Sequence, residues 1–491
     1  MTSIEKSPRA LLVPMKTQGH WTPFVHLMRA LAAHGINLTV CLTKIRADEL
    51  RILLEKGEFE NVDVEIVEVF RDTTHIPNTT RTVDRMVEDF EEYKDKLALL
   101  MPTVSCVIVD MFVGVVCVDF ADEWRIPMYN FVTSACAFTF CLLHTPTLLD
   151  ENWSYSNPAK SNSHINLPGL EMFTGADIPE TIAKTPTLYR KHSDAFKRSA
   201  AVIINSFEEY DGKQQNILTQ QLELHVQPGR FSIPPSTFHL PRPVTRSVRH
   251  LKPKVYPVGP LRLVATSRLD EKQNIPTGTH ECIEWLNRQA NSSVLFICFG
   301  SVLPLAAALR SAFIEALGST GTRFLWALRL AEGDHEAEAV VEDFESRTRD
   351  RGLVVRSWVP QEEVLQHPAV HGFLSHCGWN SIMEAIQGGI PIVACPMYAE
   401  QALNARFIVE ESKIAILIAH KGQVGDVDGQ EVTKAIRLFM DDERRQSLRQ
   451  NILRLKEAAN ATVAEGGSSH QHLKNLVAAI SKSVNGEPSQ T

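Results

Sequence analysis

A short polar segment that follows an apolar run has the residue types of an anion site. The sequence HCGWNSIMEAIQGG, residues 376–389, comes directly after the apolar run HGFLS, and a helix is expected from about Asn380. Backbone N–H groups at a helix start carry partial positive charge and lack partners within the helix. A diphosphate would fit there. A capping box between Ser381 and Glu384, beside an interior His376, is the alternative explanation.

Side chains suited to a sugar nucleotide follow neighbouring apolar runs. Trp358 ends one run and Gln361 follows it, while Glu400 and Gln401 come just after PIVACP. Because the ends of parallel strands meet along one edge of a sheet, we expect these residues to lie close to residues 376–389. An indole can stack on a base for about 1–3 kcal/mol. Carboxylate and amide groups can bind sugar hydroxyls, so the pattern predicts a site for a nucleotide sugar.

A histidine and an aspartate in the N-terminal part could form a catalytic pair. His20 lies in the segment TQGHW after the run RALLVPM, and Asp110 ends the run VSCVIVD. An imidazole titrates near neutral pH and suits a general base, and a carboxylate would fix its tautomer and stabilise the imidazolium. Asp119 and Asp122, in the following helix, are alternative partners. The alternative for His20 itself is an exposed loop residue.

Common cofactor and metal motifs are missing. No GxGxxG follows the first apolar run and no GxxxxGK[ST] occurs, which argues against a dehydrogenase and a P-loop enzyme. His367 and His371 have the i,i+4 spacing of a zinc pair, but Pro368 lies between them and no HExxH glutamate accompanies them, so we expect no metal site. In GDVDGQE, Asp428 is expected to cap a helix, with Glu431 completing a capping box.

Composition limits the classes of protein. A chain of 491 residues with 44% hydrophobic and 22% charged residues predicts a globular protein of two or three domains. The formal net charge of -8 and the absence of a basic cluster argue against a nucleic-acid partner. No signal peptide and no span of about 20 apolar residues is found. Nine cysteines without a CxxC pair predict reduced thiols and a cytoplasmic location.

Apolar runs alternate with helix patterns in two series. RALLVPM, NLTVCLT, VSCVIVD, IPMYNFV and AVIINSF belong to the first series, and SVLFICFGS, RFLWALR, GLVVRSW, HGFLSH and PIVACP to the second. This alternation predicts two α/β domains with doubly wound parallel sheets. In the first helix, Thr22 is the expected N-cap, Pro23 the first helical residue and Gly35 the end.

The domain bounds follow from these series. We expect an N-terminal Rossmann-like domain over residues 1–257, with a proline-rich insert at about 225–255, and a linker over 258–277. A C-terminal Rossmann-like domain covers residues 278–465. Residues 466–491 form a C-terminal helix and tail that packs back on the N-terminal domain.

The run WVPQEEVLQHPAVHGFLSHCGWNSIMEAIQGGIPIVACPMYAEQ, residues 358–401, closely resembles the signature box of the plant secondary-product UDP-glycosyltransferases. GHWTPFVHLMRALAAHG, CVIVDMF, FVTSA, INSFEE, VYPVGPL and FICFGSV extend the resemblance over most of the chain. It implies the glycosyltransferase fold of the B type (GT-B), in which two Rossmann-like domains with parallel sheets face each other across a cleft. The C-terminal domain would hold the donor and the N-terminal domain the acceptor.

The resemblance also implies roles for single residues. Trp358 would stack on uracil, with the backbone at Val359 pairing with the base edge, and Gln401 favours UDP-glucose as the donor. The implied donor site as a whole consists of Trp358, Val359 and the ribose ligands Gln361 and Glu384; of His376, Gly378, Asn380, Ser381 and Ser301 at the diphosphate; and of Trp379, Glu400, Gln401 and Thr133 at the sugar.

The implied reaction is an inverting glucosyl transfer that needs no cofactor and no metal. His20, oriented by Asp110, would take the proton of an acceptor hydroxyl, and the oxygen would attack the anomeric carbon as UDP leaves. His376 and the helix start would stabilise the charge on the leaving phosphate. We expect a monomer.

The acceptor is expected to be a small hydrophobic molecule, with a flavonoid or another phenolic first and a terpenoid or hormone alcohol as alternatives. Its pocket would involve Phe112, Phe138, Phe140 and Met172, each of which could equally be core. Another UDP-sugar as donor, or a binding protein without transferase activity, are the alternative functions. The chain departs from the family pattern at Ile382, where threonine is common, in the helix LPLAAALRSAF, which lacks a usual glutamine, and in its long proline-rich stretch.

Overall fold

The computed structural model describes residues 7–72, 79–154, 156–225, 254–266, 280–300, 304–331, 333–420 and 426–485. Most of the proline-rich insert, most of the predicted linker and Ser301 lie outside these residues. The predictions made for them are therefore not examined by the structure.

Seven parallel strands form the N-terminal sheet in the order β3-β2-β1-β4-β5-β6-β7. Its strands are β1 (Arg9–Val13), β2 (Asn37–Thr43), β3 (Val64–Phe70), β4 (Cys106–Asp110), β5 (Met128–Val132), β6 (Ala201–Ile204) and β7 (Lys254–Pro257). The helices and 3-10 turns are α1 (Gln18–Ala32), α2 (Lys44–Glu55), α3 (Thr79–Ala98), η1 (Met101–Thr103), α4 (Gly114–Glu123), α5 (Cys136–Asp150), η2 (Gly175–Asp177), α6 (Glu180–Lys184), α7 (Pro186–Lys197), α8 (Glu208–His225) and α9 (Leu261–Thr266).

Six parallel strands form the C-terminal sheet in the order β10-β9-β8-β11-β12-β13. They are β8 (Val294–Cys298), β9 (Arg323–Ala327), β10 (Gly352–Val355), β11 (Val370–Ser375), β12 (Ile392–Ala394) and β13 (Ala415–Leu417). The helices are α10 (Glu281–Leu286), α11 (Ala307–Thr320), α12 (His335–Thr348), α13 (Gln361–Gln366), α14 (Trp379–Gly388), α15 (Gln401–Glu410), α16 (Gly429–Met440), α17 (Asp442–Val463) and α18 (Ser468–Asn485).

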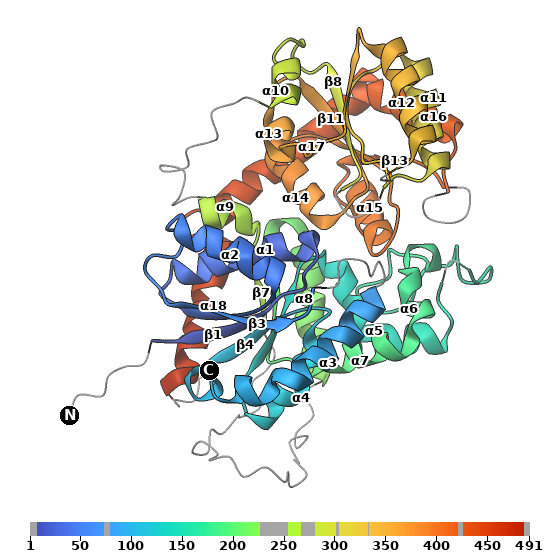
Figure 1. Ribbon diagram of the computed structural model, residues 1–491. Helices are drawn as coiled ribbons and strands as arrows, with labels where there is room; N and C mark the ends of the chain where they lie inside the picture. The colour runs from blue at the N-terminus through green and yellow to red at the C-terminus, as the bar shows by residue number, and fades with distance from the viewer. Residues whose placement is uncertain are drawn as a thin grey trace.

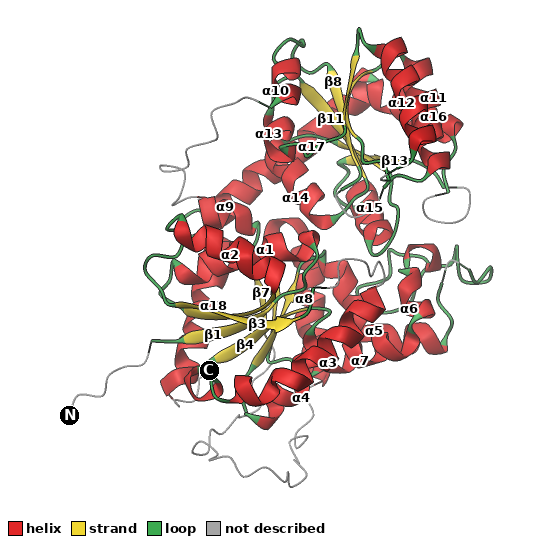
Figure 2. Cartoon of the chain, in the orientation of Figure 1, coloured by secondary structure: helices red, strands yellow, loops and turns green. Residues whose placement is uncertain are grey.

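Helices cover both faces of each sheet (Figure 2). The two predicted series of strands and helices are therefore confirmed as two α/β units. The last helix, α18, returns to the N-terminal sheet and packs beside β7 (Figure 1), where Leu473, Leu476 and Ile480 are buried with residues of β1, β2 and α1.

The start of α1 was predicted wrongly. Thr17, not Thr22, is the N-cap residue, and Pro23 lies inside the helix rather than at its first position. The earlier start places Trp21 on the buried face of α1, where it is 3% exposed within the core beside β1 and β2. His20 consequently lies in the first turn of a helix and not in a loop.

Near the second sheet, the Asp428 cap is confirmed, since its Oδ1 accepts a hydrogen bond from the N–H of Glu431 at 2.9 Å. The helix expected from about Asn380 begins one residue earlier, at Trp379.

Candidate active site

His20 and Asp110 form a hydrogen-bonded pair at the carboxyl edge of the N-terminal sheet. The Nδ1 of His20 lies 2.7 Å from Oδ2 of Asp110, which is the fully buried last residue of β4. The other oxygen, Oδ1, accepts a hydrogen bond from the N–H of Phe112 at 3.0 Å, so the carboxylate is held at both oxygens. The Thr133 hydroxyl lies 2.9 Å from the same His20 nitrogen. With its proton on Nδ1 facing Asp110, neutral His20 has its lone pair on Nε2, where a general base needs it.

The electrostatic surroundings of His20 favour proton uptake. Burial lowers the pKa of His20, but the charge and hydrogen bond of Asp110 raise it by more, and the charge of Glu400 adds to this. The net pKa is above the ordinary 6.5. Glu400 belongs to the C-terminal half, so the two halves of the predicted site lie close enough for its charge to raise the pKa of His20.

The start of α14 offers free backbone donors. Gly378 occupies the N-cap position with extended backbone, φ −61° and ψ 142°, and no side chain caps the helix. Ser381 and Glu384 lie inside the helix, and neither accepts from its first N–H groups, so the capping-box alternative is wrong. The N–H groups of the first turn are therefore available to an anion, as expected for a diphosphate site.

His376 is enclosed by two glycines. A Cβ atom at Gly378 would lie 2.5 Å from Nε2 of His376, and one at Gly300, whose φ is +80°, would lie 3.0 Å from it. The backbone can approach the imidazole this closely only because neither residue has a side chain. Burial lowers the pKa of His376 to about 4, and its Nδ1 has no partner among the described residues. The ring is therefore neutral near pH 7 and offers a hydrogen bond rather than a positive charge.

The residues predicted for the ribose are joined at α14, and the residue predicted for the base is exposed. Trp358 is 77% exposed, which leaves its indole face open, while Val359 is buried. The Nε2 of Gln361 donates to Oγ of Ser381 at 3.1 Å and also to the carboxylate of Glu384. Burial raises the pKa of Glu384, and this is partly offset by Gln361 and by the charge of Arg262.

Two of the residues predicted for the sugar, Gln401 and Trp379, are already held by hydrogen bonds. Gln401, which is 4% exposed, accepts from the backbone N–H groups of Met397 at 2.9 Å and Tyr398 at 3.1 Å through its Oε1. The Nε1 of Trp379 donates to the backbone carbonyl of Asn205, in the N-terminal half, at 2.9 Å. The only hydrogen-bonding group of the Trp379 side chain is thus used between the two halves, which leaves its backbone N–H at the helix start for a ligand.

Further contacts join the two halves around this site. The Nδ2 of Asn380 donates to the carbonyl of Gly19 at 2.9 Å, and Nε of Arg406 donates to the carboxylate of Asp177 at 2.6 Å. The ring of Tyr210 lies 5.7 Å from that of Trp379 and 5.2 Å from that of Phe407. These cross-contacts were not predicted, because no local sequence pattern indicates them.

Of the residues predicted for the acceptor, Phe112 lies next to His20, and Phe138, which is 1% exposed, packs behind Phe112. The ring of Phe112 is 5.6 Å from that of His20 and 5.7 Å from that of Phe138. Phe140 is fully buried beneath Gly169, which is the arrangement of a core residue, and Met172 is half-buried against the core.

Two polar side chains of α7 in this region, Tyr189 and His192, were not predicted from the sequence. The rings of His192 and Tyr189 lie 5.5 and 6.4 Å from the ring of Phe112. His192 is 2% exposed, its Nδ1 has no partner among the described residues, and burial lowers its pKa to about 4. A buried neutral imidazole near His20 is a group that could recognise a polar atom of an acceptor.

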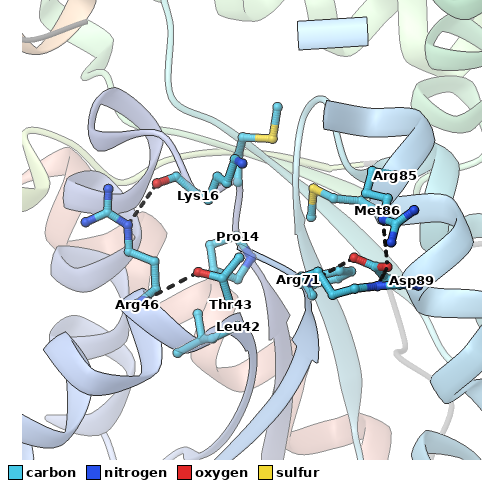
Figure 3. A pocket seen from close by; sticks show the side chains of 11 residues that line it. Pro14, Lys16, Leu42, Thr43, Arg46, Arg71, Arg85, Met86 and Asp89 are labelled. Atoms are coloured by element: carbon cyan, nitrogen blue, oxygen red, sulfur yellow. Dashed lines mark hydrogen bonds and ion pairs between the residues drawn. The ribbon is translucent and has the colours of Figure 1, made fainter. Parts of the chain in front are cut away.

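A small cavity lies at the ends of β1, β2 and β3 (Figure 3). The basic side chains around it are already engaged: Nε of Arg71 donates to Asp89 at 2.6 Å, Arg85 lies 3.3 Å from Asp89, and Nε of Arg46 donates to the carbonyl of Lys16 at 2.8 Å. None of the predicted site residues lines it, so we assign it no part of the site.

The described part of the chain has neither a metal-binding cluster nor a membrane-spanning helix. Among the described residues, no group of three or more His, Cys, Asp and Glu side chains is arranged to hold a metal ion. No helix in this part of the chain combines the length and apolar character needed to cross a membrane.

The protein has two α/β units with parallel sheets, and a histidine–aspartate pair of one unit lies close to the open helix start of the other. This fold and this site are those of a GT-B glycosyltransferase. Comparisons with known proteins agree. Residues 253–460 match the family model described as UDP-glucoronosyl and UDP-glucosyl transferase. UDP-glycosyltransferase 85A2 of Arabidopsis thaliana is 30% identical, over 96% of this chain and 98% of the relative, and UDP-glycosyltransferase 73E1 of Stevia rebaudiana is 29% identical, over 96% of each.

A solved structure extends the similarity to three dimensions. A UDP-glucosyltransferase from Polygonum tinctorium capable of glucosylating indoxyl is 26% identical, with a TM-score of 0.77 over 97% of this chain and 99% of that chain. The chain belongs to the plant UDP-glycosyltransferase family.

Proposed function

We propose that this UDP-glycosyltransferase is an inverting glucosyltransferase that moves glucose from UDP-glucose to a hydroxyl group of a small hydrophobic acceptor, with His20 as the general base. The observation that carries the proposal is the His20–Asp110 hydrogen bond of 2.7 Å directly beside Gly19, whose carbonyl contacts Asn380 at the start of α14. The proposed base on α1 and the proposed anion site at the start of α14 are thereby adjacent in space, although they belong to different halves of the protein.

In the proposed reaction, Nε2 of His20 takes the proton of the acceptor hydroxyl as the oxygen forms a bond to the anomeric carbon. The bond between that carbon and the diphosphate oxygen breaks, and UDP leaves. Attack opposite the leaving group converts an α-linked donor into a β-glucoside. Asp110 stabilises the imidazolium, while the N–H groups of α14 and the neutral His376 donate hydrogen bonds to the leaving diphosphate.

The proposed donor site places uracil on Trp358, the ribose near Gln361 and Glu384, and glucose near Glu400 and Gln401. The exposed indole and the hydrogen-bonded group of Gln361, Ser381 and Glu384 support this placement. The related enzyme from Polygonum tinctorium is a UDP-glucosyltransferase, which supports glucose as the sugar.

We propose a phenolic acceptor, such as a flavonoid, bound against Phe112 and Phe138. The apolar ring of Phe112 lies next to His20 and is backed by that of Phe138, which suits a flat aromatic molecule, and the related Polygonum enzyme is capable of glucosylating indoxyl. We also propose that the enzyme acts in the cytoplasm, since all nine cysteines are free thiols, and as a monomer, since one chain supplies both halves of the site.

The test is mass spectrometry of products. The protein is incubated with a panel of phenolics and terpenoid alcohols. Each acceptor is tested in separate reactions with UDP-glucose, UDP-galactose and UDP-glucuronic acid as the donor. We expect a mass gain of one hexose on phenolics with UDP-glucose. UDP binding without transfer to any acceptor would instead support a binding protein, and transfer only from another sugar would overturn the choice of donor.

The pH dependence of the reaction should report the raised pKa of His20. Only the neutral imidazole accepts a proton, so kcat/KM should rise with pH through an apparent pKa above 6.5. Asp110→Asn removes the charge that raises the pKa of His20 against the effect of burial, so the acidic limb should move to lower pH. The value of kcat should fall by about 10²–10⁴-fold. An acidic limb at the same pH in both proteins would show that it reports a group other than His20.

The amide of Gln401 gives a second, smaller prediction. Gln401→Glu keeps an oxygen to accept from the N–H groups of Met397 and Tyr398 but removes the amide NH2 group, which in the proposed donor site would donate to a sugar hydroxyl. Affinity for UDP-glucose should fall by about 1 kcal/mol, roughly fivefold, while affinity for UDP stays unchanged in calorimetric titrations. The control is Gln366→Glu, at the exposed end of α13. Equal losses for UDP and UDP-glucose would mean that Gln401 only shapes the loop.

A further inference from the structure

Pro23 removes a hydrogen-bond donor close to the active site. It is an interior residue of α1, which begins at Gln18. In a regular helix the N–H of residue 23 would donate to the carbonyl of residue 19, but proline has no N–H, and its ring pushes against the carbonyl four residues earlier. The carbonyl of Gly19 therefore lacks the backbone N–H that would normally donate to it within the helix.

The C-terminal half of the protein supplies the missing hydrogen-bond donor. The Nδ2 of Asn380, the second residue of α14, donates to the Gly19 carbonyl at 2.9 Å. The next residue of α1 is His20, which is bonded to Asp110. A single hydrogen bond thus connects the first turn of the helix that carries the proposed base with the first turn of the helix that forms the proposed diphosphate site.

The side chain of Asn380 suits this double position. Its amide has two N–H groups. One is used on Gly19, so the other is left for a phosphate oxygen. One planar amide then links the leaving group to α1, so the Asn380 side chain can move away from α1 only by breaking its bond to Gly19.

We infer that Pro23 is a positioning residue. It keeps the Gly19 carbonyl free to accept from Asn380 and so holds His20 at a fixed distance from the bound UDP-sugar. The inference rests on the proposed function. It assigns the proline a role across the domain boundary that does not depend on any contact between Pro23 and a substrate.

Pro23→Ala restores an N–H that pairs with Gly19 within α1 and competes with Asn380. With UDP-glucose and quercetin, or the panel member with the highest turnover, kcat should fall about tenfold while the affinity for UDP stays within twofold. The melting temperature should not fall, because alanine completes the helix. Pro146→Ala, at the other proline inside a described helix, α5, is the matched control and should keep its activity and its melting temperature.

A double-mutant cycle separates positioning from a local effect on the helix. If Pro23 acts through Asn380, Pro23→Ala should change kcat less than twofold in the Asn380→Ala background. An equal tenfold loss in both backgrounds, or no loss in the wild-type background, would overturn the inference.

A crystal structure of Pro23→Ala gives a readout that requires no turnover. We expect the Gly19 carbonyl to accept from the backbone N–H that the substitution introduces, and the Asn380 amide to turn away. A retained 2.9 Å contact between Asn380 and Gly19 would overturn the inference. Failure of the proposed function looks different, because the wild-type protein itself would then transfer no sugar.

Discussion

His20→Ala should lower the rate of glucoside formation by about 10²–10⁴-fold and leave the affinity for UDP nearly unchanged. The imidazole is oriented by Asp110 at 2.7 Å and lies beside, not within, the proposed diphosphate site. Its removal takes away proton transfer but none of the groups that hold uracil, ribose or diphosphate. Rates are measured by mass spectrometry of the glucoside, and UDP affinity by calorimetry.

The matched control is His34→Ala. His34 lies just after the end of the same helix, and its Nδ1 contacts the carbonyl of Ala30 at 2.9 Å, far from any proposed ligand group. It should keep nearly full activity. If His20→Ala lost UDP affinity and thermal stability together with activity, His20 would be a structural residue, and the proposed base would have to be sought elsewhere.

Trp358→Ala should weaken binding of UDP and UDP-glucose by about 1–3 kcal/mol, which is about 5- to 150-fold. The side chain is 77% exposed, so its removal costs little core packing and the melting temperature should barely change. The loss should appear in calorimetric titrations with UDP alone. Trp358→Phe keeps a smaller ring and should recover part of the affinity. Unchanged affinity in Trp358→Ala would place the uracil at another surface.

The alternation of strands and helices was predictable because apolar runs such as VSCVIVD and HGFLSH are buried on both faces of their sheets. The pairing of His20 with Asp110 was predictable because His20 follows β1 and Asp110 ends β4, and the carboxyl ends of these neighbouring strands meet. The start of α1 could not be predicted from the local sequence, because the burial of Trp21 outweighs the usual preference for proline at the first helical position.

The contacts between the two halves could not be predicted from any local sequence pattern. The bonds of Asn380 to Gly19, of Trp379 to Asn205 and of Arg406 to Asp177 depend on how two separately folded sheets are placed. Likewise, hydrophobicity alone does not distinguish Phe112, next to His20, from Phe140, packed under Gly169.

The central claim is that one site is built from the His20–Asp110 pair of the N-terminal half and the open start of α14 in the C-terminal half. A crystal structure of the complex with UDP tests it most directly. The account predicts uracil on Trp358 and the diphosphate within hydrogen-bond distance of the first-turn N–H groups of α14, with its terminal phosphate toward Nε2 of His20. A diphosphate bound away from α14, or on a face that does not include His20, would contradict it.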